Sequence, residues 1–363
     1  MKILMLVNHY LTIRIFRREL IQELAKNNEV VISIPEGEKE YMDELRSFGA
    51  RLVYDENMDR RKIDVLSDFK VISGYKKLLK AEKPDRVITY TIKCNIYGAM
   101  ACRSLNIPCY CNITGLGSAY YNGGALKFIT SFLYKVAMKN AKVVFFENKG
   151  NEKTLLDKKI FKPEQTYVLN GAGVNLEKFT FSEYPQKQAP ISFLFFARIM
   201  KEKGVDELFY AIEKLSGEYD NLEFKFIGIY EDEYEEKVNV LESRGLIHYY
   251  GFQKDVIPFI QQCSCVVLPS YHEGMANTLL ESAAIGRPII TSNIHGCKEA
   301  VIDFESGFLA NVCDEEDLYQ KMKMFIELPY EKKADMGRVA RKHMEKNFDK
   351  YDIVKETMDI VLG

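Results

Sequence analysis

Short apolar runs alternate with amphipathic segments along the whole chain. Residues 1–7 and 191–197 are each typical of a buried strand, and each is followed by a helical pattern. Further strand-like runs lie at residues 86–90, 142–146 and 224–228. Alternating strand and helix patterns predict parallel sheets with helices on their faces. Because the pattern starts twice, we expect an α/β protein with two Rossmann-like parallel-sheet domains.

The boundary between the halves is marked by the polar segment 182–190, which contains two prolines and separates two strand-like runs. That composition is typical of an interdomain linker. A chain of 363 residues also suits two domains, since single cores seldom grow past about 250 to 300 residues. We therefore predict an N-terminal domain at 1–181, a C-terminal domain at 190–345, and a helical, polar tail at 346–363.

The two halves differ in charge, although the formal net charge of the chain is only −2. Residues 1–180 contain 29 Lys and Arg against 20 Asp and Glu, whereas residues 181–363 contain 21 against 32. This asymmetry indicates that the N-terminal half meets an anionic partner. The chain has no apolar run of about 18 residues and starts directly with a strand pattern, so we expect a cytoplasmic protein.

The cysteines and acidic clusters do not form an evident metal site. Two of the eight cysteines stand at Cys109 and Cys111 and two at Cys263 and Cys265, a spacing that places each pair on one face of a strand. Neither pair has the two-residue gap of a zinc knuckle, so buried thiols are expected instead. The acidic runs 231–233 and 314–317 are interpreted as solvated surface. We expect neither a metal nor a cofactor.

The run from Glu273 to Glu281 follows the apolar stretch 263–269 and predicts strand, tight loop and helix. It places one carboxylate in the loop and the other inside the helix, about 12 Å apart if both were helical. A helix start with unpaired N–H groups suits a diphosphate. The backbone expected to contact it belongs to Gly274, Met275, Ala276, Asn277 and Thr278. Two glutamates at this spacing are weak evidence by themselves, because solvated helix faces often carry such pairs.

A cationic loop, 198–204, follows the strand pattern at 193–197 and contains Arg198 and Lys203. In open α/β sheets, ligands bind at the carboxyl ends of strands. A guanidinium and an ammonium there suit a diphosphate leaving group, which gains charge as its bond breaks. Taken alone, the loop is equally consistent with an ordinary solvated connection.

The segment after the first strand is the candidate acceptor region. Residues 8–20 predict a loop and a helix, and they combine His9, Arg14 and Arg17 with aromatic side chains. A phosphate-bearing acceptor would suit these cations.

Several of these motifs together resemble the retaining glycosyltransferases of family 4, which have the GT-B fold. They are the Glu-x7-Glu run at 273–281, the segments 283–291 and 294–301, and the Arg-x4-Lys-Gly pattern at 198–204. The resemblance implies two Rossmann-like domains facing an interdomain cleft, a tail that often crosses back to the first domain, and no metal. It implies that Glu281 holds the ribose of a nucleotide-sugar and that Glu273 lies near the donor sugar. Arg198 and Lys203 would stabilise the diphosphate, and Phe252 would lie near the base.

Residues 90–98 and 112–120 resemble the branch of that family that extends polyprenyl-diphosphate-linked sugars in bacterial surface polysaccharide and glycan pathways. This implies a lipid-linked saccharide acceptor near Lys93. Gly115 and Gly117 permit close backbone approach to phosphate or sugar, although a plain turn is the alternative. The chain departs from the family at two places. Asn8-His9 stands where the loop after the first strand often has Gly-Gly, and the segment that starts at Thr114 stands where many members have a histidine.

The resemblance thus implies a retaining hexosyltransferase that moves a sugar from a nucleotide diphosphate-sugar, with UDP-HexNAc or UDP-hexose as the expected donor, to a hydroxyl of a lipid-diphosphate-linked saccharide with an α linkage. A GT-B nucleotide-sugar epimerase and a non-catalytic sugar-nucleotide-binding scaffold are the alternatives. No nucleic-acid partner is expected.

The segment 125–139 has a broad apolar helical face and three lysines, so it could lie at a membrane surface. A helix buried against its own domain is the competing interpretation. With the resemblance, the expected location is peripheral, at the cytoplasmic face of the cell membrane.

Overall fold

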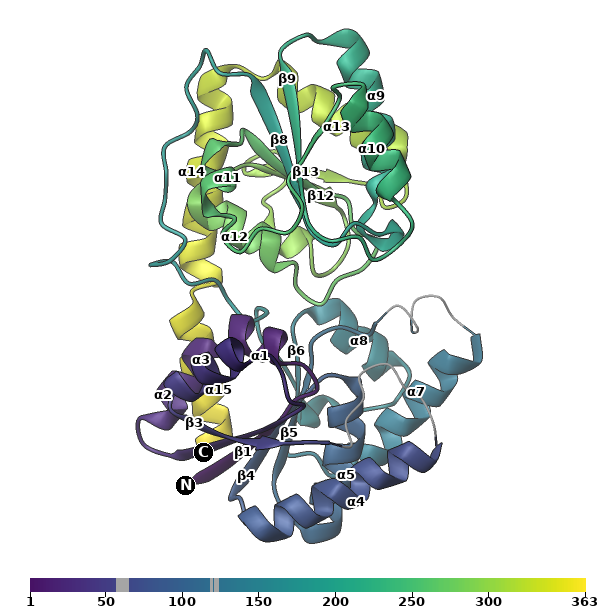
Figure 1. Cartoon of the computed structure of the whole chain (residues 1–363), viewed down its shortest axis with the longest axis vertical. Helices are drawn as coiled ribbons and strands as arrows, with labels where there is room; N and C mark the ends of the chain where they lie inside the picture. The colour runs from purple at the N-terminus through teal and green to yellow at the C-terminus, as the bar shows by residue number, and fades with distance from the viewer. Residues whose placement is uncertain (57–64, 118–119, 121–123) are drawn as a thin grey trace. The chain divides into compact units, whose positions relative to one another are not determined.

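The computed structural model describes residues 1–56, 65–117, 120 and 124–363 (Figure 1). They divide into two compact units. One unit combines residues 1–172 with 350–363, and the other contains residues 173–349. The polar segment 182–190 belongs to the second unit, in which the buried Arg287 donates hydrogen bonds to the carbonyl oxygens of Ser182 and Glu183, each at 2.9 Å.

The first unit is built on one parallel sheet with the strand order β3-β2-β1-β4-β5-β6-β7 among its described residues. The strands are β1 Lys2–Leu6, β2 Glu29–Ile34, β3 Ala50–Tyr54, β4 Arg86–Tyr90, β5 Cys109–Ile113, β6 Val143–Phe146 and β7 Thr166–Val168. The helices are α1 Tyr10–Phe16, α2 Arg18–Ala25, α3 Lys39–Ser47, α4 Val65–Glu82, α5 Ala99–Leu105, α7 Gly124–Ala137, α8 Lys149–Asp157 and α15 Lys350–Leu362, with a π-helix at Cys94–Gly98 and a 3₁₀ turn at Pro163–Gln165.

Both faces of this sheet are buried, which explains why its strands read as continuous apolar runs. Successive residues of β1 belong to different cores: Ile3 and Met5 pack with α1, α2, α3 and α15, whereas Leu4 and Leu6 pack with α4, α5, α7 and α8. Since side chains alternate along a strand, this division follows directly from the period of two.

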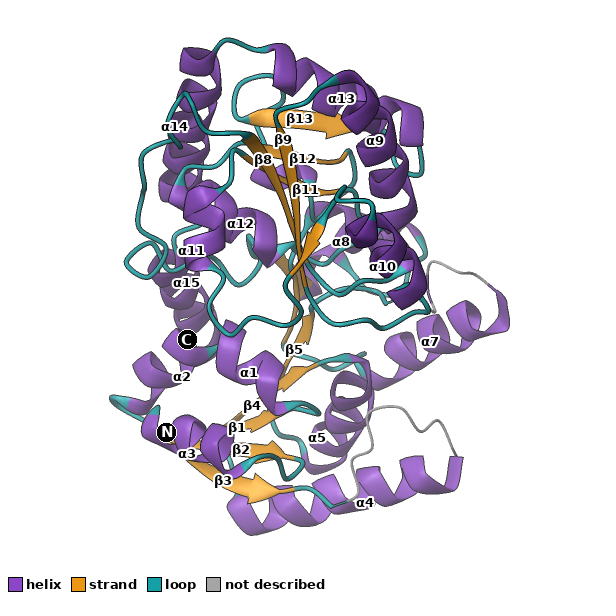
Figure 2. Cartoon of the chain, turned by 45° about the horizontal axis from the view of Figure 1, so that its top comes forward, coloured by secondary structure: helices purple, strands orange, loops and turns teal. Residues whose placement is uncertain are grey.

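The second unit repeats the same plan with the strand order β10-β9-β8-β11-β12-β13 in its described part. Its strands are β8 Ile191–Phe196, β9 Leu222–Ile227, β10 His248–Tyr249, β11 Cys265–Leu268, β12 Ile289–Ser292 and β13 Gly307–Ala310. Its helices are α9 Val205–Glu218, α10 Glu235–Ser243, α11 Ile257–Gln262, α12 Asn277–Ile285, α13 Glu315–Glu327 and α14 Tyr330–Asn347, with 3₁₀ turns at Lys201–Lys203 and Lys298–Ala300. Figure 2 shows helices on both faces of this sheet, with α11, α12 and α14 opposite α9, α10 and α13.

Every strand pairing in both sheets is parallel. In each sheet the strand order reverses beside the first strand, between β1 and β4 and between β8 and β11. The prediction of two Rossmann-like sheets is therefore confirmed. The two reversal points matter for function, because open α/β sheets bind ligands outside the carboxyl ends of the strands that flank them.

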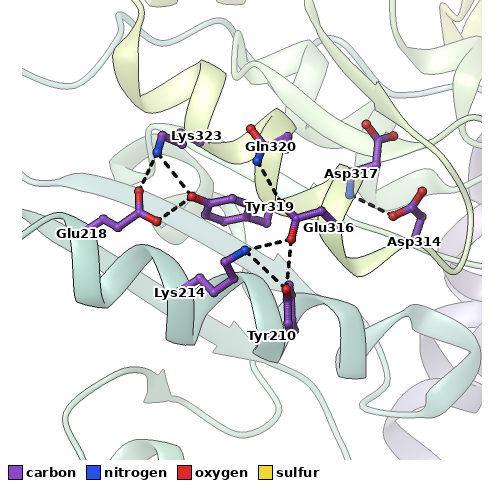
Figure 3. Close-up of polar contacts among 9 residues, drawn as sticks. All are labelled: Tyr210, Lys214, Glu218, Asp314, Glu316, Asp317, Tyr319, Gln320 and Lys323. Atoms are coloured by element: carbon purple, nitrogen blue, oxygen red, sulfur yellow. Dashed lines mark hydrogen bonds and ion pairs between the residues drawn. The ribbon is translucent and has the colours of Figure 1, made fainter.

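Helices α9 and α13 are joined on their outer side by a polar network (Figure 3). Lys214 donates to Glu316 at 2.8 Å, and Lys323 donates to Glu218 at 2.6 Å. Tyr210 and Tyr319 donate to the same two carboxylates. Asp314, which the sequence placed on a solvated surface, accepts a hydrogen bond from the Asp317 amide and thereby caps α13.

Seven of the eight cysteines are buried thiols and Cys313 is exposed. The sulfur atoms of Cys109 and Cys111 lie 3.7 Å apart on β5, as their spacing predicts. Cys263 differs from the prediction, because it ends α11 and only Cys265 lies on β11. Within the described ranges, no helix is both long and apolar enough to cross a bilayer.

Candidate functional site

The strongest candidate site lies at the reversal point of the second sheet. Strands β8 and β11 are parallel neighbours, with Phe193 opposite Cys265 and Leu194 opposite Val266. The loops that follow their carboxyl ends are therefore adjacent. One loop contains Arg198 and Lys203, and the other contains Glu273, so the fold brings together residues about 70 positions apart that the sequence had singled out separately.

An ion pair between Lys203 and Glu273 forms the centre of this site. Each side chain is 14% exposed, so the pair is largely withdrawn from water yet still reachable. The hydroxyl of the buried Ser270 donates to the same carboxylate oxygen, Oε1, at 2.9 Å. Two donors thus fix the orientation of Glu273, and the ammonium is already placed where a ligand could meet it. Ser270 was not predicted from the sequence.

The loop after β8 approaches the loop after β11 so closely that a glycine is required. Gly204 has φ of +71°, and a Cβ at this position would lie 2.1 Å from the carbonyl oxygen of Pro269. A side chain would therefore push the two loops apart. This contact explains the glycine that follows Lys203 in the sequence pattern.

A third loop, after β12, closes on Glu273 from another side. Gly296 has φ of +92°, and a Cβ there would lie 2.7 Å from the Glu273 carbonyl oxygen. The Gly296 carbonyl accepts a hydrogen bond from the Ala276 amide at 2.8 Å. Gly296 is thus a positioning residue, which in the sequence is visible only as part of the family-like segment 294–301.

The segment after Glu273 leads into α12. Met275 and Ala276 are buried, so their side chains belong to the core and only their backbone can face a ligand. The hydroxyl of Thr278 donates to the carbonyl oxygen of Phe196 at 3.1 Å, which fixes the helix start to the end of β8. Glu281 lies in the second turn of α12, four residues after Asn277 and so on the same side of the helix. The predicted order of strand, loop and helix is confirmed.

Arg198 is 45% exposed and forms an ion pair with Glu231. The neighbouring Asp232 accepts a hydrogen bond from the Lys201 amide at 2.8 Å. The acidic run 231–233 therefore holds the cationic loop in place, and the interpretation of this run as plain solvated surface was incomplete. Arg198 and Lys203 have different carboxylate partners.

Two further residues of the loop after β11 connect it to the 3₁₀ turn Lys201–Lys203 and to the start of α9. Tyr271 donates through its hydroxyl to Glu207 at 2.7 Å, and burial raises the pKa of this phenol. The Nε2 atom of His272 lies 3.2 Å from Glu202. These contacts, which depend on tertiary approach, had no signal in the sequence. Phe252, the predicted base contact, follows β10 and is 65% exposed.

The candidate acceptor residues lie in the first unit, where two of them are engaged in ion pairs. Arg17 lies 2.7 Å from Glu147 and stacks over the Tyr90 ring at 5.0 Å. The Arg14 guanidinium lies 2.7 Å from the Glu44 carboxylate. It also stacks over the Tyr41 ring, 4.6 Å from the ring centroid. Arg17 is buried, so it holds α1 and α2 against the sheet, and Arg14 is the more accessible of the two.

The remaining first-unit candidates follow β1, β4 and β5 at the carboxyl edge of the sheet. His9 follows β1 and stacks on Tyr10, with ring centroids 5.1 Å apart. Lys93 follows β4 and directly precedes the π-helix. Gly115 and Gly117 follow β5 with φ of +149° and +77°, so both use the backbone freedom expected of them.

The backbone after β4 is unusual. Thr91 has φ of +73°, which is strained for a β-branched residue. Next to it, the fully buried Asn95 accepts from the Thr89 hydroxyl at 2.6 Å and donates to the Asn112 carbonyl oxygen at 2.8 Å. These bonds tie the ends of β4 and β5 together and keep the connection rigid.

No group of three or more His, Cys, Asp or Glu side chains suited to a metal ion occurs among the residues that the structure describes. The expectation of a metal-free site stays a prediction.

Two family descriptions match the chain. "Glycosyl transferase 4-like" matches residues 2–148, and "Glycosyl transferases group 1" matches residues 177–343. The N,N'-diacetylbacillosaminyl-diphospho-undecaprenol alpha-1,3-N-acetylgalactosaminyltransferase of Campylobacter jejuni is 28% identical over 330 residues, which cover 86% of both chains. The UDP-Gal:alpha-D-GlcNAc-diphosphoundecaprenol alpha-1,3-galactosyltransferase of Escherichia coli is 27% identical over 283 residues, covering 70% of this chain and 69% of the relative.

Among solved structures, Anabaena HepE in complex with UDP and glucose superposes with a TM-score of 0.80. The identity is 16%, and the match covers 99% of this chain and 98% of that one. At this identity the likeness shows the fold alone.

Proposed function

Because the chain belongs to the glycosyltransferases, with a 4-like domain followed by a group 1 domain on the GT-B fold, we propose a specific reaction for it. It transfers a sugar from a nucleotide diphosphate-sugar to a hydroxyl of a lipid-diphosphate-linked saccharide and forms an α linkage with retention. The observation that carries the proposal is the Lys203–Glu273 pair at the reversal point of the second sheet.

The second unit supplies the donor site in this proposal. Lys203 and Arg198 neutralise the diphosphate, and the first turn of α12 offers backbone N–H groups to it. Glu281, on the same helix, accepts hydrogen bonds from the ribose hydroxyls. Phe252, exposed beyond β10, lies at the same carboxyl edge and contacts the base. We infer UDP as the carrier because the E. coli relative is named for UDP-Gal.

The acceptor assignment rests on the relatives and on charge. Both relatives named above act on undecaprenol-diphosphate-linked sugars according to their names. The first unit carries the cationic excess that a diphosphate-linked acceptor requires. His9 and Lys93, at the ends of β1 and β4, and the partly exposed Arg14 are its proposed contacts. Arg17 supports them from the interior, since it is buried against Glu147.

The chemical step requires no protein base in this account. The bond between the anomeric carbon and the leaving phosphate oxygen breaks, and the acceptor oxygen bonds to the same face of that carbon. The acceptor proton moves to the leaving phosphate oxygen. Lys203 and Arg198 stabilise the charge that develops there, and Glu273 orients Lys203 and the donor sugar.

Nucleoside diphosphate release from a panel of UDP- and GDP-sugars tests the proposal, with and without a polyprenyl-diphosphate-linked saccharide. Release from one donor that depends on the acceptor supports the transferase and identifies the sugar. Tight nucleotide binding without release over a broad acceptor panel would contradict it and favour a non-catalytic scaffold. Conversion of the donor sugar to its epimer without net release would favour an epimerase.

The same acceptor implies a location. A polyprenyl chain stays in the bilayer, so we propose that the protein works at the cytoplasmic surface of the cell membrane as a peripheral protein.

A further inference from the structure

Helix α7 is apolar on two opposite sides, and among the residues that the structure describes only one side is packed into a core. Its inner side buries Tyr134 and Ala137 in the core that flanks the first sheet. Its outer side presents Phe128, Ile129 and Phe132, which are 75%, 54% and 65% exposed. Large apolar side chains that cluster at such exposure usually mark an interaction surface.

The three outer residues form one face. At about 100° per residue, Phe132 lies roughly 40° from Phe128 and Ile129 roughly 100° from it, whereas Ala137 lies on the opposite side. The interpretation of this segment as a helix buried against its own domain is therefore confirmed for the inner side, and the membrane interpretation concerns the outer side alone. The inner side explains why α7 folds against the unit, and the large apolar side chains of the outer side are left exposed.

The surroundings of α7 are cationic. The sequence has no Asp or Glu between Asp85 and Glu147, although the same stretch contains seven Lys and Arg residues. Lys127, on α7, and Lys158 both lie over the Tyr120 ring, at 4.8 and 4.6 Å from its centroid. Arg103 donates to the Val136 carbonyl oxygen in the last turn of α7, at 2.6 Å. Lys135 follows on the outer side, roughly 20° from Phe128.

A second helix adds to this surface. Phe69 of α4 is 66% exposed. Both α4 and α7 pack against the π-helix, and Figures 1 and 2 show the two helices projecting from the same side of the first unit.

We propose that the outer face of α7, formed by Phe128, Ile129 and Phe132, inserts into the interfacial region of an anionic lipid bilayer. The combination decides the partner: exposed aromatic side chains enter the boundary between head groups and acyl chains, and neighbouring lysines contact lipid phosphates. A protein partner would need carboxylates arranged around one helix, whereas an anionic membrane presents negative charge everywhere on its surface. The inference rests on the proposed function, because it explains how the enzyme reaches a lipid-linked acceptor.

Co-sedimentation of the full-length protein with vesicles tests this surface. Vesicles of phosphatidylethanolamine with phosphatidylglycerol are compared with vesicles of phosphatidylcholine alone. The wild type should bind the anionic vesicles and be released by salt. The double variant Phe128→Ser/Phe132→Ser should lose binding about tenfold or more, because the buried aromatic area is gone. Phe304→Ser, at a 53% exposed phenylalanine of the second unit, is the matched control and should bind as the wild type does.

Equal vesicle binding by the wild type and the double variant would overturn the proposal. So would a wild-type dimer, measured by light scattering, that the double variant abolishes without any change in vesicle binding, since the face would then serve a second copy of this chain.

A second readout separates this inference from the proposed function. With the acceptor embedded in anionic vesicles, the double variant should turn over about tenfold more slowly than the wild type, whereas with a short-chain, water-soluble acceptor analogue both should be equal. Loss of turnover with the soluble analogue as well would mean that α7 serves catalysis or folding and would overturn membrane insertion as its role. If the wild type transfers sugar to neither acceptor, the proposed function fails, and the vesicle binding of the variants still decides the question of α7.

Discussion

At the scale of single residues, the central feature is a carboxylate held by two donors. Glu273 accepts hydrogen bonds from Lys203 and Ser270 through the same carboxylate oxygen. Lys203 lies in the loop after β8 and Ser270 in the loop after β11, both at the carboxyl edge of the second sheet. The ion pair fixes the ammonium in the loop after β8, where the proposed diphosphate would meet it. Preorganised charge of this kind usually provides the largest part of an enzyme's rate enhancement.

The variants Lys203→Met and Glu273→Gln should each lower kcat by a factor of about a hundred to a thousand, which corresponds to about 3 to 4 kcal/mol. Lys203→Met removes positive charge from the place where the leaving diphosphate gains negative charge, and Glu273→Gln removes the carboxylate that orients Lys203. Steady-state release of nucleoside diphosphate measures this effect, and circular dichroism checks that the fold is intact.

Lys214→Met is the matched control for Lys203→Met. It removes a lysine from an ion pair of the same unit, Lys214–Glu316, that lies on the outer side of α9. Its turnover should equal that of the wild type. Turnover of Lys203→Met or Glu273→Gln close to the wild-type rate would remove these residues from the site.

The site is also proposed to work without a metal, because Lys203 and Arg198 provide the positive charge. Turnover should therefore be unchanged after treatment with EDTA. Loss of activity on chelation, restored by Mg²⁺ or Mn²⁺, would show that these cations are insufficient.

Residues such as Lys203 and Glu273 could be singled out from the sequence because their motifs are local: each follows a recognisable strand at a fixed spacing. Ser270 and Gly296 could not, since their roles depend on where separate loops meet. Arg287 shows the same limit. The sequence marked it only as part of the family-like segment 283–291, whereas in the structure its guanidinium donates hydrogen bonds to backbone carbonyl oxygens, including those of Ser182 and Ile260.

At the scale of elements, the site depends on how closely the loops after β8 and β11 approach. Gly204→Ala should destabilise the second unit and lower turnover, because the new Cβ would combine a strained φ with an approach of 2.1 Å to the Pro269 carbonyl. Strain of a positive φ alone costs about 1 to 3 kcal/mol. Urea denaturation and turnover are the measurements.

Gly245→Ala provides the comparison for that variant. Gly245 has the same φ of +71°, but nothing lies within 4 Å of its Cβ position. It should show only the cost of backbone strain and normal turnover. If both alanine variants lose the same stability and keep the same activity, the contact between the two loops has no role in forming the site.

The polar network between α9 and α13 gives a prediction about pH (Figure 3). Hydrogen bonds from Lys214, Gln320 and Tyr210 lower the pKa of Glu316 from 4.5 to about 2. The folded protein therefore binds this proton less tightly than the unfolded chain does, so the stabilisation is present above pH 4.5 and is lost as the pH falls toward 2. The Tm difference between wild type and Glu316→Gln should shrink over this range. A difference that stays constant with pH would contradict the prediction.

Most strands were predictable because a parallel sheet with two covered faces requires continuous apolar runs, and β1, β4 and β8 are clear examples. The π-helix at Cys94–Gly98 and the positive φ of Thr91 were not, because both depend on the buried bonds of Asn95 rather than on local propensity.

At the scale of the whole molecule, the sequence indicated two α/β domains, and the structure has two parallel sheets whose first six strands follow the same order, with β7 as a seventh strand in the first sheet. The charge difference between the halves was visible in composition, but composition did not show which of the cations are already paired with carboxylates. Arg14 and Arg17 contribute to the cationic excess, yet both are bound to carboxylates. The acid-free stretch around α7 is the part of that excess that faces outward beside exposed aromatic side chains.

The fate of the sugar tests the account most directly. A donor labelled in its sugar is incubated with the protein and a polyprenyl-diphosphate-linked saccharide, and the label is followed into the lipid fraction. The account predicts that label enters the lipid in an amount equal to the nucleoside diphosphate released, and that the new linkage is α. Release of nucleoside diphosphate with free labelled sugar, or a product with a β linkage, would contradict it.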